Sequence, residues 1–249
     1  MRLTRAYVAT ALRTGDRMEL PAAPAAHVAR VLRARSGDSL VLFNGDGREY
    51  AARIESVSGT RVAISVGDSR PVDRESPIAL TLLQCIPRGD RMDWIVQKAT
   101  ELGVHRIVPL LSERSVVKFS GRQAESKAAH WRAVAASACE QCGRNRLPTI
   151  ETPLTLADFL GADPHTGERL VFDPDADDPA PAGTAPVSQQ FAIGPEGGFA
   201  PDEIDALRAA GYRGLRLGPR ILRADTAAVA ALVWLQSRFG DLHGARQDR

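Results

Sequence analysis

The sequence predicts an α/β protein in two parts: a small β-barrel-like unit, followed by a larger domain with a mainly parallel sheet. Residues 39–66 contain alternating or β-branched runs separated by turn signals, which is typical of short antiparallel strands. Beyond residue 78, apolar strand patterns alternate with helical patterns, as in parallel strands joined by helical crossovers. The chain has 249 residues, of which 44% are hydrophobic, so it is long enough for two such parts.

The N-terminal unit is expected to contain three strands and a hairpin. The strand patterns lie at 39–44, 49–57 and 61–66. The turn after the first strand contains Asn44-Gly45 and Asp46-Gly47, and such pairs favour hairpins because they tolerate positive φ. No G-x-G-x-x-G pattern occurs there, so we interpret the segment as a hairpin and not as a nucleotide-binding loop.

One helix is expected before these strands, at 22–35. It carries His27, Arg30 and Arg33, whose three-residue spacing would place them on one face. The two arginines suit contacts with a phosphate backbone. His27 is as compatible with capping or packing as with such a contact.

The second part is expected to alternate strands and helices. The strand patterns lie at 78–86, 106–111, 169–172, 190–193 and 213–217, and the helical patterns lie at 90–102, 123–141, after Pro201 and at 225–239. Asp90 is expected to cap the first helix, and Gly103 to end it. The spacing of the aspartates in 173–186 does not match an EF-hand, so a solvated loop is expected. The expected boundaries are 1–71 for the N-terminal unit, 72–77 for a linker, 78–243 for the α/β domain and 244–249 for a tail.

Missing motifs exclude several classes of enzyme. The sequence has no P-loop, no G-x-S-x-G elbow and no H-E-x-x-H pattern. Cys139 and Cys142 form a C-x-x-C, but a structural zinc needs four ligands and the five histidines are scattered. We therefore expect the cysteines to be packing residues, and we expect no metal.

The distribution of charge indicates a polyanionic partner. The net charge is only +2, but residues 1–150 carry 23 basic and 15 acidic side chains, whereas residues 151–249 carry 9 and 15. Arginine accounts for 29 of the 32 basic residues, and its planar fork suits phosphate and base recognition. A bias toward arginine can also come from codon usage, so the charge asymmetry is the better indication of a polyanionic partner.

The protein is expected to be cytoplasmic. Its longest apolar run, 227–235, has nine residues, whereas a membrane-spanning helix needs about 18. The apolar patch near the N-terminus is short and interrupted by threonine, which argues against a secretory signal.

Two glycine-containing segments follow expected strands. The first, 193–199, reads IGPEGGF, and the second, 217–227, reads LGPRILRADTA. Glycines at the carboxyl end of a strand let the backbone approach a ligand closely, and this end is where open α/β sheets bind ligands. We therefore expect both segments to border one binding site.

These segments, together with three others in order along the chain, resemble the RsmE family of the SPOUT superfamily. The others are DWIVQKATELGV at 93–104, VPLLSERS at 108–115 and ACEQCGRNRLP at 138–148, and HVARVLRARSGD at 27–38 is similar to the family's PUA-like domain. The family methylates N3 of a uridine in bacterial 16S rRNA. One difference is Asp225, where the family usually has glutamate.

The resemblance implies a C-terminal SPOUT trefoil-knot domain, a PUA-like β-barrel domain and a homodimer. It also implies that S-adenosylmethionine binds in the knot. The implied cofactor-binding residues are Phe172, Gly194, Pro195, Glu196, Gly197, Gly198, Leu217, Gly218, Ile221, Leu222 and Thr226. Gly197→Val is expected to abolish cofactor binding while leaving the fold intact, because a β-branched side chain tolerates neither positive φ nor close approach to the ligand.

Methyl transfer to uracil N3 requires removal of a proton and stabilisation of the charge that spreads to O2 and O4. Arg223 is the candidate for stabilising this anion, and Asp225 is the candidate base or orienting group. The expected RNA-binding residues are Arg30, Arg33, Arg88, Arg91, Arg114 and Arg144. The expected partner is the 16S rRNA of the small ribosomal subunit.

Two alternatives remain open at this point. A related knotted methyltransferase acting on tRNA or another RNA would share these motifs. A catalytically silent RNA-binding module would explain the charge asymmetry, but it would leave the two glycine segments without a purpose.

Overall fold

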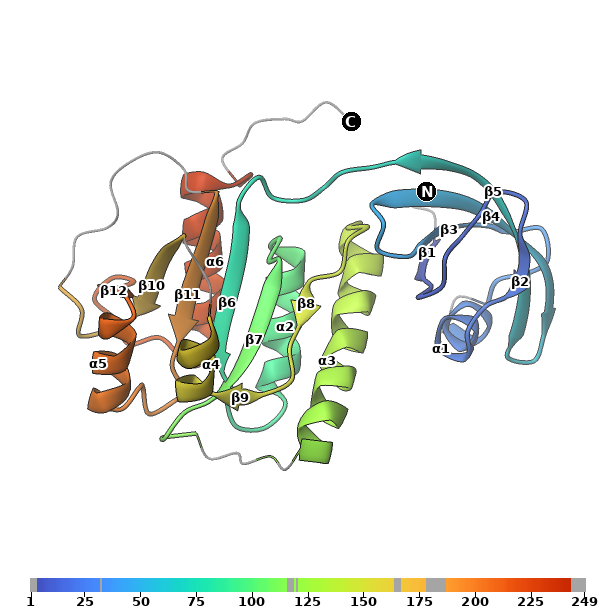
Figure 1. The fold of residues 1–249 in the computed structure, drawn as a ribbon. Helices are drawn as coiled ribbons and strands as arrows, with labels where there is room; N and C mark the ends of the chain where they lie inside the picture. Colours follow the sequence, from blue (N-terminus) through green and yellow to red (C-terminus); the bar gives the residue numbers. More distant parts are fainter. Residues whose placement is uncertain are drawn as a thin grey trace. The chain divides into compact units, whose positions relative to one another are not determined.

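The computed structural model describes residues 4–31, 33–115, 119, 121–163, 167–177 and 187–242 (Figure 1). The chain divides into two units. Unit 1 comprises Met1–Glu75 and Ala136–Leu147, and unit 2 comprises Ser76–Ala135 and Pro148–Arg249. The division after Glu75 falls inside the expected linker at 72–77. The sequence did not predict that a second segment, 136–147, belongs to the first unit.

Unit 1 contains a five-stranded sheet in the order β1-β3-β4-β5-β2. The strands are β1 (Thr4–Tyr7), β2 (Arg17–Glu19), β3 (Ser39–Phe43), β4 (Arg48–Ser58) and β5 (Arg61–Pro71). β1 pairs in parallel with β3, and the other pairs are antiparallel. Gly45 and Gly47 have φ of 97° and 86°, as the expected hairpin between β3 and β4 requires. The short strands β1 and β2 were not predicted.

The expected helix at 22–35 is shorter in the structure. α1 (Ala22–Ala26) continues into a π-helical turn, η1 (His27–Val31). Arg33 follows with φ of 51°, and the amide of Ala34 donates to the carbonyl of Val28 at 3.1 Å, which closes the helix end. The prediction that Arg33 shares a helix face with His27 and Arg30 is therefore wrong, although all three side chains are exposed.

A buried carboxylate organises the edge of unit 1. Glu49, on β4, is 5% exposed, and it accepts hydrogen bonds from Arg5 at 2.5 Å, Arg74 at 2.9 Å and Arg70 at 3.0 Å. Burial opposes the ionisation of Glu49, but the three guanidinium groups outweigh it and lower its pKa to about 2. Glu49 is therefore ionised at neutral pH and joins β1, β4 and the segment after β5.

The end of α3 (Gly121–Cys142) and the residues after it complete unit 1. The Glu140 carboxylate accepts from the amide of Tyr7 at 2.9 Å. The side chain of Asn145 accepts from Arg5 at 2.5 Å and donates to the carbonyl of Val72 at 3.0 Å. Polar contacts therefore hold this segment against β1 and against the chain that follows β5.

Arg144, which was expected to bind RNA, also lies in this segment. It is 4% exposed, and its guanidinium forms an ion pair with Glu75. The guanidinium of Arg144 is therefore engaged by Glu75 inside unit 1, and its contact with RNA stays a prediction. The neighbouring cysteines agree with the packing interpretation: Cys139 is fully buried, and contact with Cys142 together with burial raises the pKa of its thiol.

Unit 2 contains a sheet in which every strand pair is parallel. Its order is β12-β10-β11-β6-β7-β8, with β9 also paired to β7. The strands are β6 (Ala79–Cys85), β7 (Arg106–Leu111), β8 (Thr149–Ile150), β9 (Leu154–Thr155), β10 (Glu168–Phe172), β11 (Ser188–Ile193) and β12 (Arg213–Leu215). The mainly parallel sheet was predicted, and its five longer strands begin and end within two residues of their expected positions.

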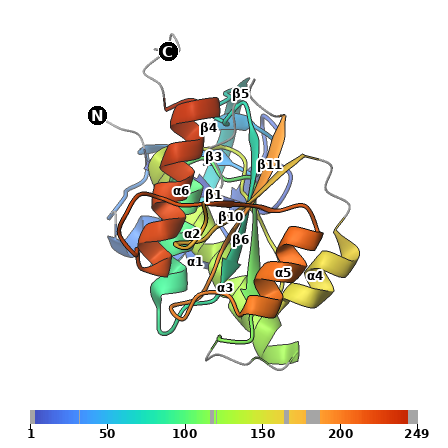
Figure 2. The same cartoon turned by 90° about the vertical axis from the view of Figure 1, so that its left-hand side faces the viewer.

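Helices cover both faces of this sheet (Figure 2). α2 (Arg91–Glu101), α6 (Ala224–Phe239) and the first part of α3 share one apolar core with the sheet, whereas α4 (Leu156–Ala162) and α5 (Pro201–Ala209) share another. α4 and the short strands β8 and β9 were not predicted. Asp90 stands at the start of α2 without a side-chain cap bond, and Gly103, with φ of 79°, follows its end as expected.

Some expectations concern residues that the structure describes only in part. Residues 178–186 of the expected solvated loop and the expected tail at 244–249 lie outside the described residues. In the described ranges, no helix has the length and apolar character needed to cross a bilayer. The same ranges contain no group of three or more side chains that could hold a metal ion.

Glu49→Gln should lower the free energy of unfolding by about 3 kcal/mol at pH 7, because the folded pKa of about 2 lies well below the ordinary value of 4.5. The stabilisation is fully present above about pH 4.5 and is lost as the pH falls toward 2. The difference between wild type and variant in urea denaturation should therefore shrink between pH 5 and pH 3. Glu55→Gln, at an exposed position on the same strand, is the control and should change stability little. A pH-independent difference would contradict this assignment.

Candidate functional site

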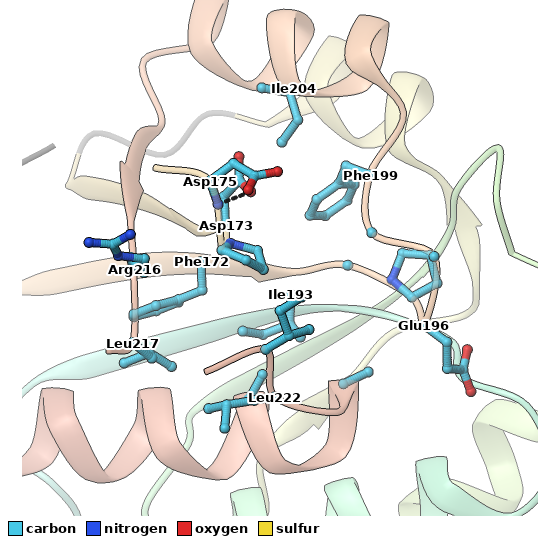
Figure 3. Close-up of a pocket in the computed structure, with 18 of the residues that line it drawn as sticks. Phe172, Asp173, Asp175, Ile193, Glu196, Phe199, Ile204, Arg216, Leu217 and Leu222 are labelled. Carbon is cyan, nitrogen blue, oxygen red and sulfur yellow. Dashed lines mark hydrogen bonds between the residues drawn. The ribbon is translucent and has the colours of Figure 1, made fainter. Parts of the chain in front are cut away.

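A cavity of about 740 Å³ opens at the carboxyl ends of β10, β11 and β12 (Figure 3). The parallel register places these ends side by side: Phe172, the last residue of β10, pairs with both Ile193 and Leu215, the last residues of β11 and β12. The segments that follow the three strands therefore meet at one edge of the sheet. They are 173–177, 194–200 and 216–223, and all three contribute to the cavity wall.

The floor of the cavity is apolar. Phe172, Ile193 and Leu215 come from the strand ends, and Leu217 and Leu222 come from the segment that follows β12. Figure 3 shows Phe172, Leu217, Ile193 and Leu222 gathered on one side of the cavity. The predicted cofactor-binding residues Phe172, Leu217 and Leu222 are therefore brought together. An apolar floor of this kind suits a planar organic group.

The first glycine segment forms a tight loop after β11. A Cβ at Gly194 would lie 3.1 Å from the amide nitrogen of Phe199, so a larger residue would make a tight contact with the backbone. Gly198 has φ of 67°, and its amide donates to the carbonyl of Pro195 at 2.9 Å. These two glycines are therefore required by the conformation of the loop.

Gly197 differs from the expectation. Its φ is not in the left-handed region, and a Cβ there would make ordinary van der Waals contact with Arg114 at 3.5 Å. The prediction that backbone conformation restricts Gly197 is therefore wrong, and the restriction applies to its two glycine neighbours in the loop. Sequence pattern cannot distinguish three glycines that lie so close together.

Neighbouring segments hold this loop in place. Arg114, in the segment after β7, donates to the carbonyl of Gly197 at 2.8 Å. The Glu203 carboxylate accepts from the amides of Ala200 and Glu113, both at 2.9 Å. Arg114 also lines the cavity, so this predicted RNA-binding residue lies beside the loop.

Glu196 makes contacts of another kind. Its carboxylate accepts from the amide of Arg88 at 3.0 Å and from the guanidinium of Arg91 at 3.3 Å. These two arginines belong to the segment between β6 and the first turn of α2. They do not line the large cavity, although both were predicted to bind RNA.

The second glycine segment runs from β12 to α6. Ile221, Leu222 and Arg223 line the cavity, and Arg223 stands at the N-cap position of α6 with an exposed side chain. Ile221 is 84% exposed. The segment therefore brings both apolar and cationic side chains to the cavity.

Three predicted residues of this segment lie outside the cavity wall. Gly218 has φ of 76° and supplies the turn after Leu217. Asp225 and Thr226 lie on the first turn of α6, where the Asp225 carboxylate accepts from the amide of Thr226 at 2.8 Å. In the described part of the chain, no hydrogen bond or ion pair joins Asp225 to Arg223.

Charged side chains that were not among the predicted site residues surround the cavity mouth. Asp173 and Asp175 follow β10, Arg208 lies on α5, and Arg216 and Arg220 follow β12. The aspartates stand directly after a predicted strand, so their position at a strand end was a signal that could have found them. Arg208 had no such signal, because only tertiary packing brings α5 beside the cavity.

The chain is similar to known RNA methyltransferases over most of its length. The family described as RNA methyltransferase domain matches residues 74–236, and the family described as RNA methyltransferase PUA domain matches residues 24–66. The chain is 33% identical over 216 residues to ribosomal RNA small subunit methyltransferase E of Buchnera aphidicola, covering 86% of this chain and 85% of that protein. It is 32% identical over 221 residues to the protein of the same name from Bacillus subtilis, covering 83% and 84%.

Two solved structures are similar over nearly the whole chain. One is a protein from Legionella pneumophila in complex with the bound cofactor SAM, with a TM-score of 0.93, 38% identity, and coverage of 97% of this chain and 100% of that chain. The other is ribosomal RNA small subunit methyltransferase E from Neisseria gonorrhoeae bound to S-adenosyl methionine, with a TM-score of 0.86, 34% identity, and coverage of 97% and 100%.

Gly194→Ala should destabilise unit 2 by about 1–3 kcal/mol, because the added methyl group meets the backbone of Phe199. Gly197→Ala is the matched control, and its cost should stay within about 0.5 kcal/mol. The free energy of unfolding, measured by chemical denaturation, checks both values. Equal effects of the two substitutions would show that the loop can shift to accept a side chain at Gly194.

Proposed function

Because the chain belongs to the ribosomal RNA small subunit methyltransferase E (RsmE) family, it is an enzyme that methylates ribosomal RNA with S-adenosylmethionine, and we propose that its target is N3 of a uridine in 16S rRNA. The observation that carries the assignment of the site is the cavity at the ends of β10, β11 and β12, where both glycine segments meet.

The proposed place of action is the cytoplasm, in agreement with an rRNA substrate. The trefoil knot implied by the sequence resemblance stays a prediction.

The residues of the cavity fit S-adenosylmethionine. A volume of about 740 Å³ lies within the range of about 300–1,000 Å³ that is common for small-molecule sites. Phe172, Leu217 and Leu222 would contact the adenine ring, and the backbone of the loop that contains Gly194 and Gly198 would approach the cofactor closely. The Cβ that Gly194 lacks would make a tight contact with the loop itself, so the shape of this wall depends on glycine.

The chemistry of the reaction assigns a role to Arg223. The bound cofactor supplies an electrophilic methyl carbon on its sulfonium, so no metal is needed. Uracil N3 must lose a proton before it can attack, and negative charge then spreads to O2 and O4 of the base. Arg223 lies at the cavity wall at the start of α6, where its guanidinium and the helix N-terminus both favour an anion.

Asp225 is proposed as an orienting group. Its carboxylate accepts from the amide of Thr226 on the first turn of α6, directly after Arg223. An acidic residue in the first turn stabilises a helix N-terminus. Asp225 would therefore fix the start of α6, and with it the backbone that carries Arg223.

Arginines at the cavity mouth are proposed to receive the RNA. Arg114, Arg216 and Arg220 line the cavity and have exposed side chains, which suits contacts with phosphate oxygens. In unit 1, the exposed Arg30 and Arg33 are proposed to contact the RNA backbone outside the target nucleotide. Such contacts position the RNA, whereas selection of the uridine depends on the cavity.

The function is tested by single-turnover methylation of small ribosomal subunits and of 16S rRNA with purified protein and S-adenosylmethionine. The expected result is one methyl group at N3 of one uridine, located by mass mapping of nucleotides. Methylation of tRNA alone would replace the proposed substrate. Failure to bind S-adenosylmethionine would favour a silent RNA-binding module.

Arg223→Ala should slow methyl transfer while leaving cofactor affinity unchanged. The guanidinium favours the N3 anion, so its loss should move the pH dependence of the chemical step upward. Raising the pH should therefore restore part of the lost rate, and Arg223→Lys should restore part of it at neutral pH. The measurement is the single-turnover rate against pH, with RNA and cofactor saturating. Arg122→Ala, at an exposed position on α3, is the control, and an unshifted profile for Arg223→Ala would contradict the role.

A homodimer is also proposed, and exposed apolar side chains of unit 2 support it. Trp94 on α2 is 44% exposed, and Val233 on α6 is 41% exposed. α2 and α6 pack against each other, so the two side chains lie on neighbouring helices. Ile221, beside the cavity, adds a third exposed apolar group. An uncovered apolar surface of this kind is typical of a protein interface.

Val233→Glu should convert the dimer to a monomer, because it places a charge in the proposed interface. Sedimentation velocity at micromolar concentration measures the change. Ser237→Glu adds the same charge at an exposed position one turn further along α6 and shows whether the effect is specific to the apolar surface. A wild-type protein that sediments as a monomer would refute the homodimer.

A further inference from the structure

Glu196 stands in the middle of the proposed cofactor loop, yet its bonded partners lie outside the cavity. We infer that Glu196 is a positioning residue that docks the RNA-facing segment 87–91 onto the loop 194–199, and that its carboxylate serves RNA engagement and not cofactor binding. This inference rests on the proposed function of the site.

The contacts of the carboxylate carry the inference. One oxygen accepts from the backbone amide of Arg88 at 3.0 Å and from the guanidinium of Arg91 at 3.3 Å. In Figure 3, the Glu196 side chain extends away from Phe172 and Asp173. Both partners come from the segment between β6 and the first turn of α2, so the bonds join two parts of the chain that are more than 100 residues apart.

The cofactor loop has other restraints. The Gly198 amide donates to Pro195, Arg114 donates to the Gly197 carbonyl, and Glu203 accepts from the Ala200 amide. None of these bonds involves the Glu196 side chain. Removal of the carboxylate should therefore leave the cavity wall in place and release mainly the segment 87–91.

That segment is built to meet an anionic partner. Arg88 is exposed, and the Arg91 side chain is 39% exposed although it is paired. β6 lies next to β11 in the sheet, so the segment after β6 emerges beside the cofactor loop. Arg91 uses one nitrogen for Glu196 and keeps other N–H donors for a phosphate. Glu196, which itself lines the cavity, thus holds both arginines beside the site.

The experiment compares Glu196→Ala with Glu196→Gln in the full-length protein. Alanine removes the acceptor, whereas the glutamine oxygen can still accept from the Arg88 amide. We expect Glu196→Ala to raise the KM for RNA and the Kd for RNA about tenfold, the effect of losing one or two hydrogen bonds with a charged partner. The Kd for S-adenosylmethionine, measured by calorimetry, should stay within about twofold. Glu196→Gln should recover most of the RNA affinity.

A double-mutant cycle separates docking from a general loss of charge. If Glu196 acts through the segment 87–91, then the effects of Glu196→Ala and Arg91→Ala on RNA affinity should be smaller in combination than their sum. Asp202→Ala removes a nearby exposed carboxylate on the first turn of α5 and is the control. Additive effects of Glu196→Ala and Arg91→Ala would overturn the inference.

Two further outcomes would overturn it. If Glu196→Ala and Glu196→Gln both weaken S-adenosylmethionine binding, the carboxylate belongs to the cofactor site. If neither variant changes RNA or cofactor affinity, the contact has no functional role. Failure of the proposed function is a separate result. It would appear as a wild-type protein that does not bind S-adenosylmethionine. The RNA affinity of that protein can still be measured without cofactor.

Discussion

Parallel pairing of β10 with β11 and β12 is the constraint on which the site depends. Parallel strands end at the same edge of a sheet, and the register puts Phe172 between Ile193 and Leu215. Three segments that are distant in sequence therefore leave the sheet together. The fully buried glutamines of the central strands show how strictly this arrangement is kept: Gln190 accepts from the Tyr212 hydroxyl at 2.5 Å and donates to Asp163 at 3.1 Å. A change in register would break these buried bonds and separate the walls of the cavity.

The two units are stabilised in different ways. The core of unit 2 is apolar on both faces of the sheet, where Leu82, Ile95 and Phe191 are fully buried. Unit 1 has a smaller apolar core and concentrates ionised groups at one edge, with three arginines around Glu49 and a further pair between Arg144 and Glu75, whereas the ion pairs of unit 2, such as Arg169–Asp163, are separate. Arginine is therefore a structural residue in this protein as well as a candidate for RNA contacts. Net charge by itself does not tell these two uses apart.

The sequence predicted the longer helices and strands because each of them has its own apolar periodicity. It predicted where the cavity lies because both glycine segments directly follow predicted strands. It missed β1, β2, β8 and β9, which have two to four residues each and no extended apolar pattern around them, whereas the equally short β12 falls inside a longer apolar pattern at 213–217. It did not predict that Arg144 is buried, because residue type does not reveal burial. It expected a restricted backbone at Gly197, whereas the positive φ is at Gly198 and the tight contact is at Gly194, because φ and close contacts depend on the folded loop. Arg208 and Glu196 gained their neighbours only through tertiary packing.

The segment 136–147 has a consequence for how this architecture can be inherited. Unit 1 is discontinuous in the chain, since Met1–Glu75 is completed by residues encoded within the methyltransferase region. Glu140 and Asn145 accept hydrogen bonds from the Tyr7 amide and the Arg5 guanidinium. A gene fusion that exchanged only the first 75 codons would therefore replace the sheet of unit 1 and keep a helix end that does not match it. The sheet of unit 1 and the segment 136–147 must therefore be exchanged together. Recombination within residues 72–77 is disfavoured. Units 1 and 2 are therefore expected to have been inherited together.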